Sequence, residues 1–143
     1  MELKSFKELD STELYEILKL RAEVFVIEQD CNYLDPDGQD YSAYHLYDTK
    51  GGKIVSYARL YESQEYCHIG RVLTSESVRR EGYGISLMNQ AIKYCTSLYP
   101  NKDIVISAQE YLLKFYRDFG FVVEGERYFE DNLPHFKMRI KLS

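Results

Sequence analysis

The amino-acid sequence predicts an α/β fold in which a mixed β-sheet carries helices on both faces. Three observations lead to this prediction. Short apolar runs typical of strands alternate with segments of helical period, the connections between them are short, and the expected order is β-α-β-β-β-α-β-α-β-β. All 143 residues, 1–143, are expected to form a single domain. A chain of this length buries about two thirds of the surface that it exposes when unfolded.

The chain is expected to begin with a strand and a long helix. Residues 2–8 predict the strand, and Asp10 opens a capping-box pattern that starts a helix running to about Gln29. Arg21 and Glu28 interrupt its apolar stripe and, seven residues apart, lie on one face. They form either a structural ion network or part of a binding site. The stripe itself contains Leu14, Ile17, Leu18, Val24 and Phe25.

The segment 30–40 is rich in Asp, Asn, Pro and Gly, which is typical of turns. We expect a solvated acidic turn, with attraction of cations as the second option. The segment does not match the calcium-binding EF-hand loop, because its glycine is not at the sixth position and no glutamate closes it.

Three strands and a second helix are expected in the middle of the chain. The strands cover about 44–48, 53–61 and 66–74, and Gly51-Gly52 forms the hairpin turn between the first two. The helix covers about 82–97 and is expected to connect two parallel strands. Its core face is expected to contain Ile85, Met88, Ala91, Ile92 and Cys95.

The last third is expected to add a buried strand, a helix and two more strands. The apolar run 104–106 is typical of a central strand. A helix over about 110–119 ends at Gly120, a residue type favoured directly after a helix. The final strand has one solvated face, because Phe136, Met138, Ile140 and Leu142 alternate with Lys137, Arg139 and Lys141.

Composition excludes several classes of protein. The net charge is −5, from 18 basic and 23 acidic residues, which disfavours nucleic-acid binding and suits cationic partners such as amines. No apolar run reaches the roughly 18 residues of a membrane span, and no signal peptide is expected, so we predict a cytoplasmic protein. Three widely spaced cysteines without a CxxC pair argue against a disulfide framework. No His or Cys pair has the spacing of metal ligands, so no metal is expected.

The strongest motif lies between the strand 66–74 and the helix 82–97, as Arg79-x-x-Gly82-x-Gly84. The exposed N–H groups at a helix N-terminus and the positive end of its dipole favour phosphate. The glycines allow a ligand to approach the backbone closely. The segment is neither a P-loop nor a dinucleotide fingerprint, because the lysine of the first and the third glycine of the second are missing.

This segment resembles the acetyl-CoA-binding motif of the GNAT acetyltransferase superfamily, Q/R-x-x-G-x-G/A after a central strand. Leu113 to Phe121 is similar to the second GNAT signature, an aromatic-Tyr-x-x-x-Gly-Phe segment. The helix segment Leu20 to Gln29, together with Asp37-Gly38 and Asn132 to His135, resembles the ElaA-type branch. The resemblance covers nearly the whole chain in the same order.

The resemblance implies a GNAT fold, with the central sheet splayed at the middle strand, and acetyl-CoA as the cofactor. It implies that the pantetheine arm pairs with the backbone of Val72, Leu73 and Thr74. The pyrophosphate then takes the backbone amides of Arg79, Arg80, Glu81, Gly82, Tyr83 and Gly84. Gln109, at the end of the next strand, is included among the expected cofactor contacts. Glu81 departs from the family pattern, since a carboxylate repels pyrophosphate unless the side chain points away.

The resemblance also implies the catalytic residues. Tyr116 matches a tyrosine that protonates the leaving thiolate, although its helical neighbours equally suit a core tyrosine. His68 lies where some GNAT members keep a glutamate base, and imidazole suits that task at neutral pH. The alternative for His68 is a strand histidine without a role. Glu28, His45 and His135 are expected to contact the substrate, with structural roles as the alternative.

The sequence therefore predicts an enzyme that moves an acetyl group from acetyl-CoA to a primary amine of a small molecule or peptide, by direct attack. A non-catalytic acyl-CoA-binding or regulatory module of the same fold is the alternative. A nucleotide-binding protein of another class is disfavoured by the absent phosphate-binding lysine and ribose-binding acid. A homodimer stays open, because no decisive surface patch is visible in the sequence.

Overall fold

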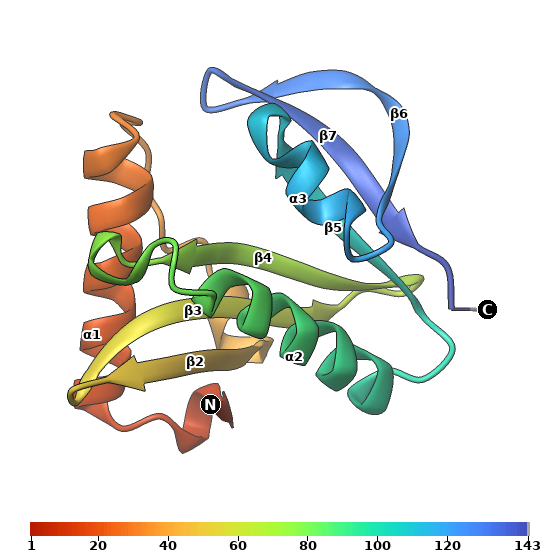
Figure 1. The fold of residues 1–143 in the computed structure, drawn as a ribbon. Coiled ribbons are helices and arrows are strands. Elements are labelled where there is room, and N and C mark those ends of the chain that lie inside the picture. Colours follow the sequence, from red (N-terminus) through yellow and green to blue (C-terminus); the bar gives the residue numbers. More distant parts are fainter. Residues whose placement is uncertain (143) are drawn as a thin grey trace.

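The computed structural model describes residues 1–142, which form one seven-stranded mixed sheet of order β1-β2-β3-β4-β5-β7-β6 (Figure 1). The strands are β1 (Glu2–Ser5), β2 (Tyr44–Lys50), β3 (Lys53–Glu62), β4 (Tyr66–Thr74), β5 (Asp103–Gln109), β6 (Val122–Glu130) and β7 (Leu133–Ile140). The α-helices are α1 (Ser11–Arg21), α2 (Tyr83–Leu98) and α3 (Leu113–Arg117). Single 3-10 turns lie at η1 (Phe6–Glu8), η3 (Gln39–Ser42), η4 (Glu76–Val78) and η5 (Glu110–Leu112). The expected α/β class and order of main elements are confirmed.

Helices cover both faces of the sheet and produce two hydrophobic cores. The larger core lies under α2 and α3, where Leu46, Ala58 and Ile69 face those helices. The smaller core lies under α1, where Tyr47 and Tyr57 point the other way. Neighbouring residues of one strand point to opposite faces, so β3, whose residues Val55 to Leu60 are all buried, is covered on both sides. None of the helices in residues 1–142 combines the length and apolar character that a bilayer crossing requires.

The first helix differs from the single α-helix that its sequence predicts. Asp10 accepts a hydrogen bond from the backbone N–H of Glu13 at 2.7 Å, as the capping pattern predicts. After Arg21 the chain continues as a π-helical segment, η2 (Ala22–Glu28). The buried face contains Ile17, Leu20, Arg21 and Val24, whereas the expected Leu14 and Leu18 are only half-buried.

Helix α2 packs against β4 much as predicted, with one exception at its start. Met88, Ala91 and Cys95 are fully buried, together with Leu87. Ile85 is 55% exposed, so its placement in the core was wrong. Ile85 belongs to the first helical turn, which lies at the opening of the sheet rather than over it, and its side chain lines the cleft described below.

A β-bulge in β4 changes which side chains face each helix. Leu73 pairs with Tyr57 and Gly70 pairs with Arg59, so β4 has one extra residue between these positions. Arg71 takes a left-handed backbone conformation there, with φ of 51°. One extra residue reverses the face of every later side chain. Leu73 therefore packs under α1 although Ile69 packs under α2.

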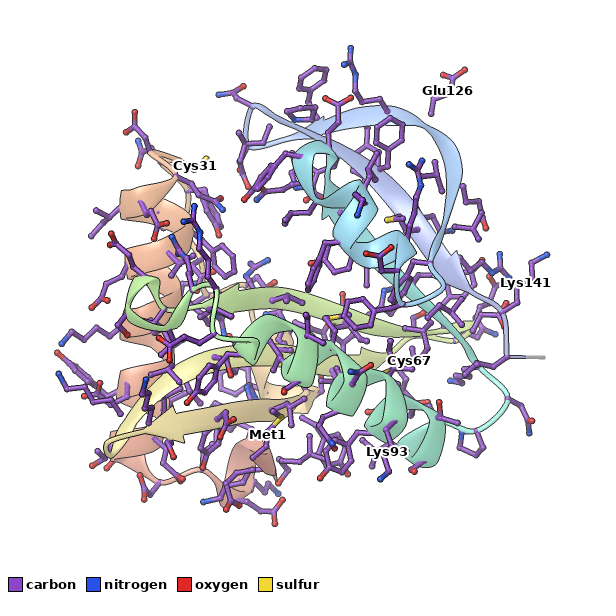
Figure 2. All side chains as sticks on the ribbon, viewed as in Figure 1. Met1, Cys31, Cys67, Lys93, Glu126 and Lys141 are labelled. Atoms are coloured by element: carbon purple, nitrogen blue, oxygen red, sulfur yellow. A yellow bond between two sulfur atoms is a disulfide. The ribbon has the colours of Figure 1, made fainter. Side chains whose placement is uncertain are left out.

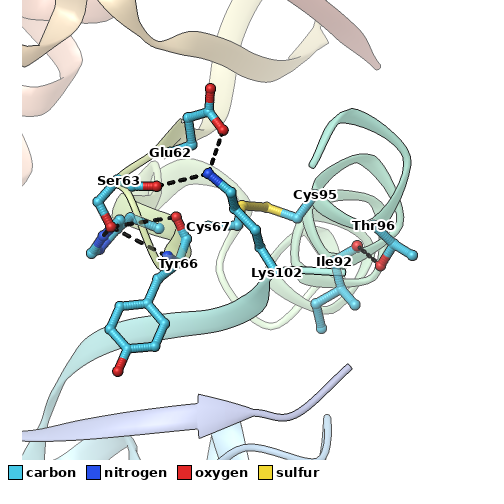
Figure 3. Close-up of a disulfide and its surroundings, with 9 residues drawn as sticks. Glu62, Ser63, Tyr66, Cys67, Ile92, Cys95, Thr96 and Lys102 are labelled. Carbon is cyan, nitrogen blue, oxygen red and sulfur yellow. Dashed lines mark hydrogen bonds and ion pairs between the residues drawn. A yellow bond between two sulfur atoms is a disulfide. The ribbon is translucent and has the colours of Figure 1, made fainter. Parts of the chain in front are cut away.

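Cys67 of β4 and Cys95 of α2 form a disulfide in the core (Figure 3). Their Cα atoms are 6.3 Å apart, within the range that a disulfide spans. The expectation that the three cysteines form no disulfide was wrong for this pair. The residues are 28 positions apart, and only the packing of α2 onto β4 brings them together. Cys31 remains a free thiol.

The acidic loop that follows η2 is not the solvated turn that its composition predicts. Asp35 and Asp40 are buried, and Arg21, whose side chain is fully buried, donates to both, at 2.8 and 2.7 Å. Two further arginines of the sheet, Arg59 and Arg71, also donate to carboxylates of this loop. The loop is therefore held against the sheet by charge rather than by apolar contacts.

Candidate functional site

The sheet splits between its two central strands, and the split forms a cleft. β4 and β5 are parallel, as expected for the strands that α2 connects, but only three residue pairs join them: Tyr66 with Asp103, Cys67 with Ile104, and His68 with Val105. β4 stays paired to β3, and β5 stays paired to β7, as each continues beyond this point. The backbone edge of β4 that faces β5 is therefore free to pair with an extended ligand.

A cleft of about 840 Å³ occupies this opening. The ends of β4 and η2 form one wall, while β5, α3 and the β6–β7 hairpin form the other. Cys31, labelled in Figure 2, lies at the far end of η2, where its thiol donates to the backbone carbonyl of Asp131 at 3.6 Å. The first wall thus meets the hairpin at that end. Val72, Leu73 and Thr74 all line the cleft.

Backbone donors are exposed at the start of α2. Gly82 is the N-cap residue, with φ of 85°, and no side chain caps the helix. The backbone N–H groups of the first turn, from Tyr83 and Gly84 onwards, therefore have no capping partner, and the turn contains no acidic residue. Gly82, Tyr83 and Gly84 line the cleft, and so do Arg79 and Arg80. This end of the cleft is suited to an anion.

The departure at Glu81 has a structural explanation. The Glu81 carboxylate accepts from Lys50 Nζ at 2.7 Å, and Glu81 is not among the residues that line the cleft. Its side chain is directed to the β2–β3 hairpin, so its charge is neutralised away from the donors of the α2 N-terminus.

Gln109 reaches across the cleft from the end of β5. Its side-chain amide donates to the side-chain oxygen of Gln29, at the end of η2, at 3.2 Å. Both residues line the cleft. The pair is a direct polar link between the two walls.

Tyr116 is a buried wall residue with an unused hydroxyl. It is 6% exposed, lines the cleft, and meets Phe115 and Phe121 edge-to-face. Within residues 1–142 its hydroxyl has no hydrogen-bond partner. Burial raises the pKa of Tyr116 well above its usual range. The hydroxyl therefore stays protonated at neutral pH and can donate a hydrogen bond or a proton.

His68 lies in the last residue pair before the strands separate, and it lines the cleft. The ring stacks on Tyr61 with centroids 4.7 Å apart, and Nε2 is 2.8 Å from Ser63 Oγ. Burial, assisted by the charge of Lys137, lowers the pKa of His68. The ring is therefore neutral at pH 7 and able to accept a proton.

The other two histidines have different environments. His135 lines the cleft, where Nδ1 lies 2.8 Å from the carbonyl of Leu133 and Nε2 lies 3.6 Å from Glu130. His45 is fully buried outside the cleft, between the Tyr57 hydroxyl at 2.6 Å and the Asp40 carbonyl at 3.0 Å. Direct contact of His45 with a substrate was thus a wrong expectation, because both ring nitrogens are used inside the fold.

Glu28 and Arg79, expected to meet different ligands, bind each other. The two guanidinium Nη atoms donate to the two carboxylate oxygens, one of them at 2.9 Å. Both side chains line the cleft and are 38% exposed. Arg79 also donates to the backbone carbonyl of Thr74 at 3.2 Å. The seven-residue spacing of Arg21 and Glu28 does not bring these two together, since each pairs elsewhere.

Sequence reasoning missed one side of the cleft. Tyr33, Tyr61 and Arg59 line it, and Arg59 lies over the Tyr61 ring at 5.6 Å. In the sequence, only the alternation of side chains along β3 could have indicated this, because Arg59 and Tyr61 lie on the same face of that strand. Among residues 1–142, no three His, Cys, Asp or Glu side chains gather in a way that would hold a metal ion.

Comparison with known proteins agrees with this geometry. A family model described as an acetyltransferase (GNAT) domain matches residues 20–142. Protein ElaA of Escherichia coli K12 is 40% identical over 136 residues, which is 92% of this chain and 89% of that protein. A UPF0039 protein of Schizosaccharomyces pombe is 42% identical over 142 residues, 97% of this chain and 95% of its own length.

Solved structures agree as well. The crystal structure of Escherichia coli ElaA superimposes with a TM-score of 0.92 at 39% identity, covering 96% of both chains. An acyl-CoA N-acyltransferase from Pseudomonas aeruginosa gives a TM-score of 0.92 at 37% identity, covering 96% of this chain and 97% of the other. With the split sheet and the uncapped helix above the cleft, these likenesses show that the chain belongs to the GNAT acetyltransferase family, in its ElaA-like branch.

Proposed function

We propose that this protein transfers an acetyl group from acetyl-CoA to a primary amine of a small molecule or peptide. One observation carries the proposal: the unpartnered hydroxyl of Tyr116 lies in the wall of a cleft whose other wall includes the uncapped start of α2. The first feature supplies an acid and the second holds a phosphate. The pantetheine arm would lie along the free edge of β4, at Val72, Leu73 and Thr74.

The chemistry follows from these positions. The amine nitrogen attacks the thioester carbonyl carbon, and a free backbone N–H of β4 stabilises the negative charge that develops on the carbonyl oxygen. His68 accepts the proton that the amine must lose, directly or through water. When the tetrahedral intermediate collapses, the carbon–sulfur bond breaks and Tyr116 donates its proton to the departing thiolate. No acyl-enzyme is formed.

The alternative is a module that binds acyl-CoA without turning it over. Such a module would use the same anion-binding end of the cleft, so the two functions differ only in the fate of the thioester. Tyr116 favours the enzyme, because a hydroxyl that lines the cleft without a hydrogen-bond partner is available there as an acid, which a purely binding role does not require.

Thiol release from acetyl-CoA tests the proposal. We expect release that depends on both the protein and an amine, in a panel of alkylamines, polyamines, amino acids and peptides with free N-termini. Mass spectrometry of the product should show one added acetyl group on the amine and none on the protein. CoA binding without amine-dependent release across the panel would favour the binding module instead.

The pH dependence of that release tests His68. Because the folded environment lowers the pKa of His68, we expect kcat/KM to fall only below about pH 6.5, the ordinary value for histidine. His68→Gln should lower kcat by about 10²-fold and flatten this acidic limb. His135→Gln provides the comparison, since both variants remove a histidine from the same cleft. An unchanged acidic limb in His68→Gln would transfer the base role to another group.

A further inference from the structure

The ion pair between Glu28 and Arg79 joins the end of η2 to the segment before α2. Glu28 is the last residue of η2, and Arg79 directly follows η4 in the loop that leads to α2. The two residues are 51 positions apart, so their pairing is a property of the fold rather than of local sequence. The hydrogen bonds raise the pKa of Arg79 and lower that of Glu28, so both groups are charged at neutral pH.

Arg79 occupies two groups that a ligand would otherwise use. One is the Glu28 carboxylate, which faces the cleft and is suited to an ammonium group. The other is the carbonyl of Thr74, at the free end of β4. In this arrangement the guanidinium cannot pair fully with a phosphate, and the carboxylate is not available to an amine.

We propose that Arg79 acts as a switch that couples cofactor binding to amine binding. When the cofactor phosphate takes the guanidinium, Glu28 is released and becomes the carboxylate that recognises the acceptor ammonium. The proposal rests on the function proposed above and adds an order to it: the cofactor binds first and completes the amine site.

Exchanging the Glu28 carboxylate for a phosphate at Arg79 requires little free energy. Both side chains are 38% exposed, and an exposed carboxylate–guanidinium pair is weak. A phosphate carries more charge than the carboxylate and also meets the positive end of α2. Glu28 lines a second hollow of about 620 Å³ between η2 and η4, which gives it room to move.

Binding of coenzyme A, measured by calorimetry, tests the first half of the proposal. Glu28→Gln removes the competing charge but keeps the side-chain shape, and we expect it to tighten coenzyme A binding about two- to fivefold. Glu62→Gln is the matched control, because Glu62 forms an exposed ion pair with Lys102 outside the cleft, as Figure 3 shows. The control should bind as the wild type does.

A double-mutant cycle shows whether the effect passes through Arg79. In the Arg79→Gln background, which should bind coenzyme A more weakly, Glu28→Gln should have no further effect. An equal gain in both backgrounds, or in the Glu62→Gln control, would mean a general charge effect and would overturn the switch. Coenzyme A binding by Glu28→Gln that is unchanged or weaker than in the wild type would also overturn the switch. Absence of coenzyme A binding by the wild type would overturn the proposed function itself.

Steady-state kinetics test the second half of the proposal, that Glu28 binds the acceptor ammonium. The amine with the highest kcat/KM in the panel is used. Glu28→Gln should raise the KM of the amine about tenfold or more, because a hydrogen bond between charged groups is lost, while the KM of acetyl-CoA falls. An amine KM that stays at the wild-type value would show that Glu28 does not receive the ammonium.

Discussion

Replacing Tyr116 by phenylalanine is expected to lower kcat by about 10²- to 10⁴-fold while coenzyme A binds within about twofold of the wild-type affinity. The substitution removes one oxygen atom and keeps the ring contacts to Phe115 and Phe121. Burial raises the pKa of Tyr116, so the wild-type hydroxyl carries its proton at neutral pH, when the thiolate departs beside it.

The same variant separates catalysis from stability. The hydroxyl has no hydrogen-bond partner within residues 1–142, so its removal breaks no hydrogen bond. We therefore expect an unchanged melting temperature together with the loss of turnover. Tyr94→Phe, on the part of α2 that packs against the large core, serves as the control and should change neither quantity much. Full kcat in Tyr116→Phe would return Tyr116 to a purely structural role.

The sequence was most informative where the structure depends on neighbouring residues. The uncapped start of α2 beside the central strand was predictable because the strand, the glycine-containing turn and the amphipathic helix follow one another directly in the chain, between Tyr66 and Leu98. Gly82 and Gly84 lie where the motif predicts, and β4 and β5 are parallel and then diverge. Divergence begins directly after His68, somewhat earlier than the expected opening at Val72.

Features that depend on distant contacts were not predictable in this way. Arg71 takes a left-handed backbone conformation that its residue type does not favour; the residues on either side of it, Gly70 and Leu73, pair with β3, and its side chain forms an ion pair with Asp35. The resulting bulge decides that Leu73 faces α1. Likewise, a helical period of 3.6 residues does not describe η2, so the positions after Arg21 could not be assigned to a face reliably.

Charged residues were the hardest to interpret from sequence alone. Glu28 and Arg79 were each assigned to a different ligand because nothing local indicates that they meet. Asp35 and Asp40 have the composition of a solvated turn, yet both are buried because their partners come from α1 and from the sheet, 14 to 36 positions away. A carboxylate acquires its role from the cation it meets, which sequence spacing does not reveal.

Replacing Arg21 by leucine is expected to lower the free energy of unfolding by about 3–5 kcal/mol, because it leaves buried carboxylates without a partner. Arg21 is fully buried and donates to Asp35 and to Asp40. Thermal denaturation should show a melting temperature lower by about 10 °C. Arg127→Leu removes an arginine from an exposed pair with Glu110 and should cost less than about 1 kcal/mol.

The loss of unfolding free energy in Arg21→Leu should be larger at neutral pH than at acidic pH. Burial opposes ionisation of Asp40, but its contacts with Arg21 and Arg59 outweigh burial and lower its pKa below the ordinary value. A carboxylate with a depressed folded pKa stabilises the fold above its unfolded pKa, near ~3.9, and this contribution is lost as pH falls through the folded pKa. The difference in unfolding free energy between wild type and Arg21→Leu should therefore be largest at neutral pH and narrow below about pH 4. A difference of the same size at pH 3 and pH 7 would mean that Arg21 stabilises the protein by packing against Tyr57 rather than by holding the acidic loop.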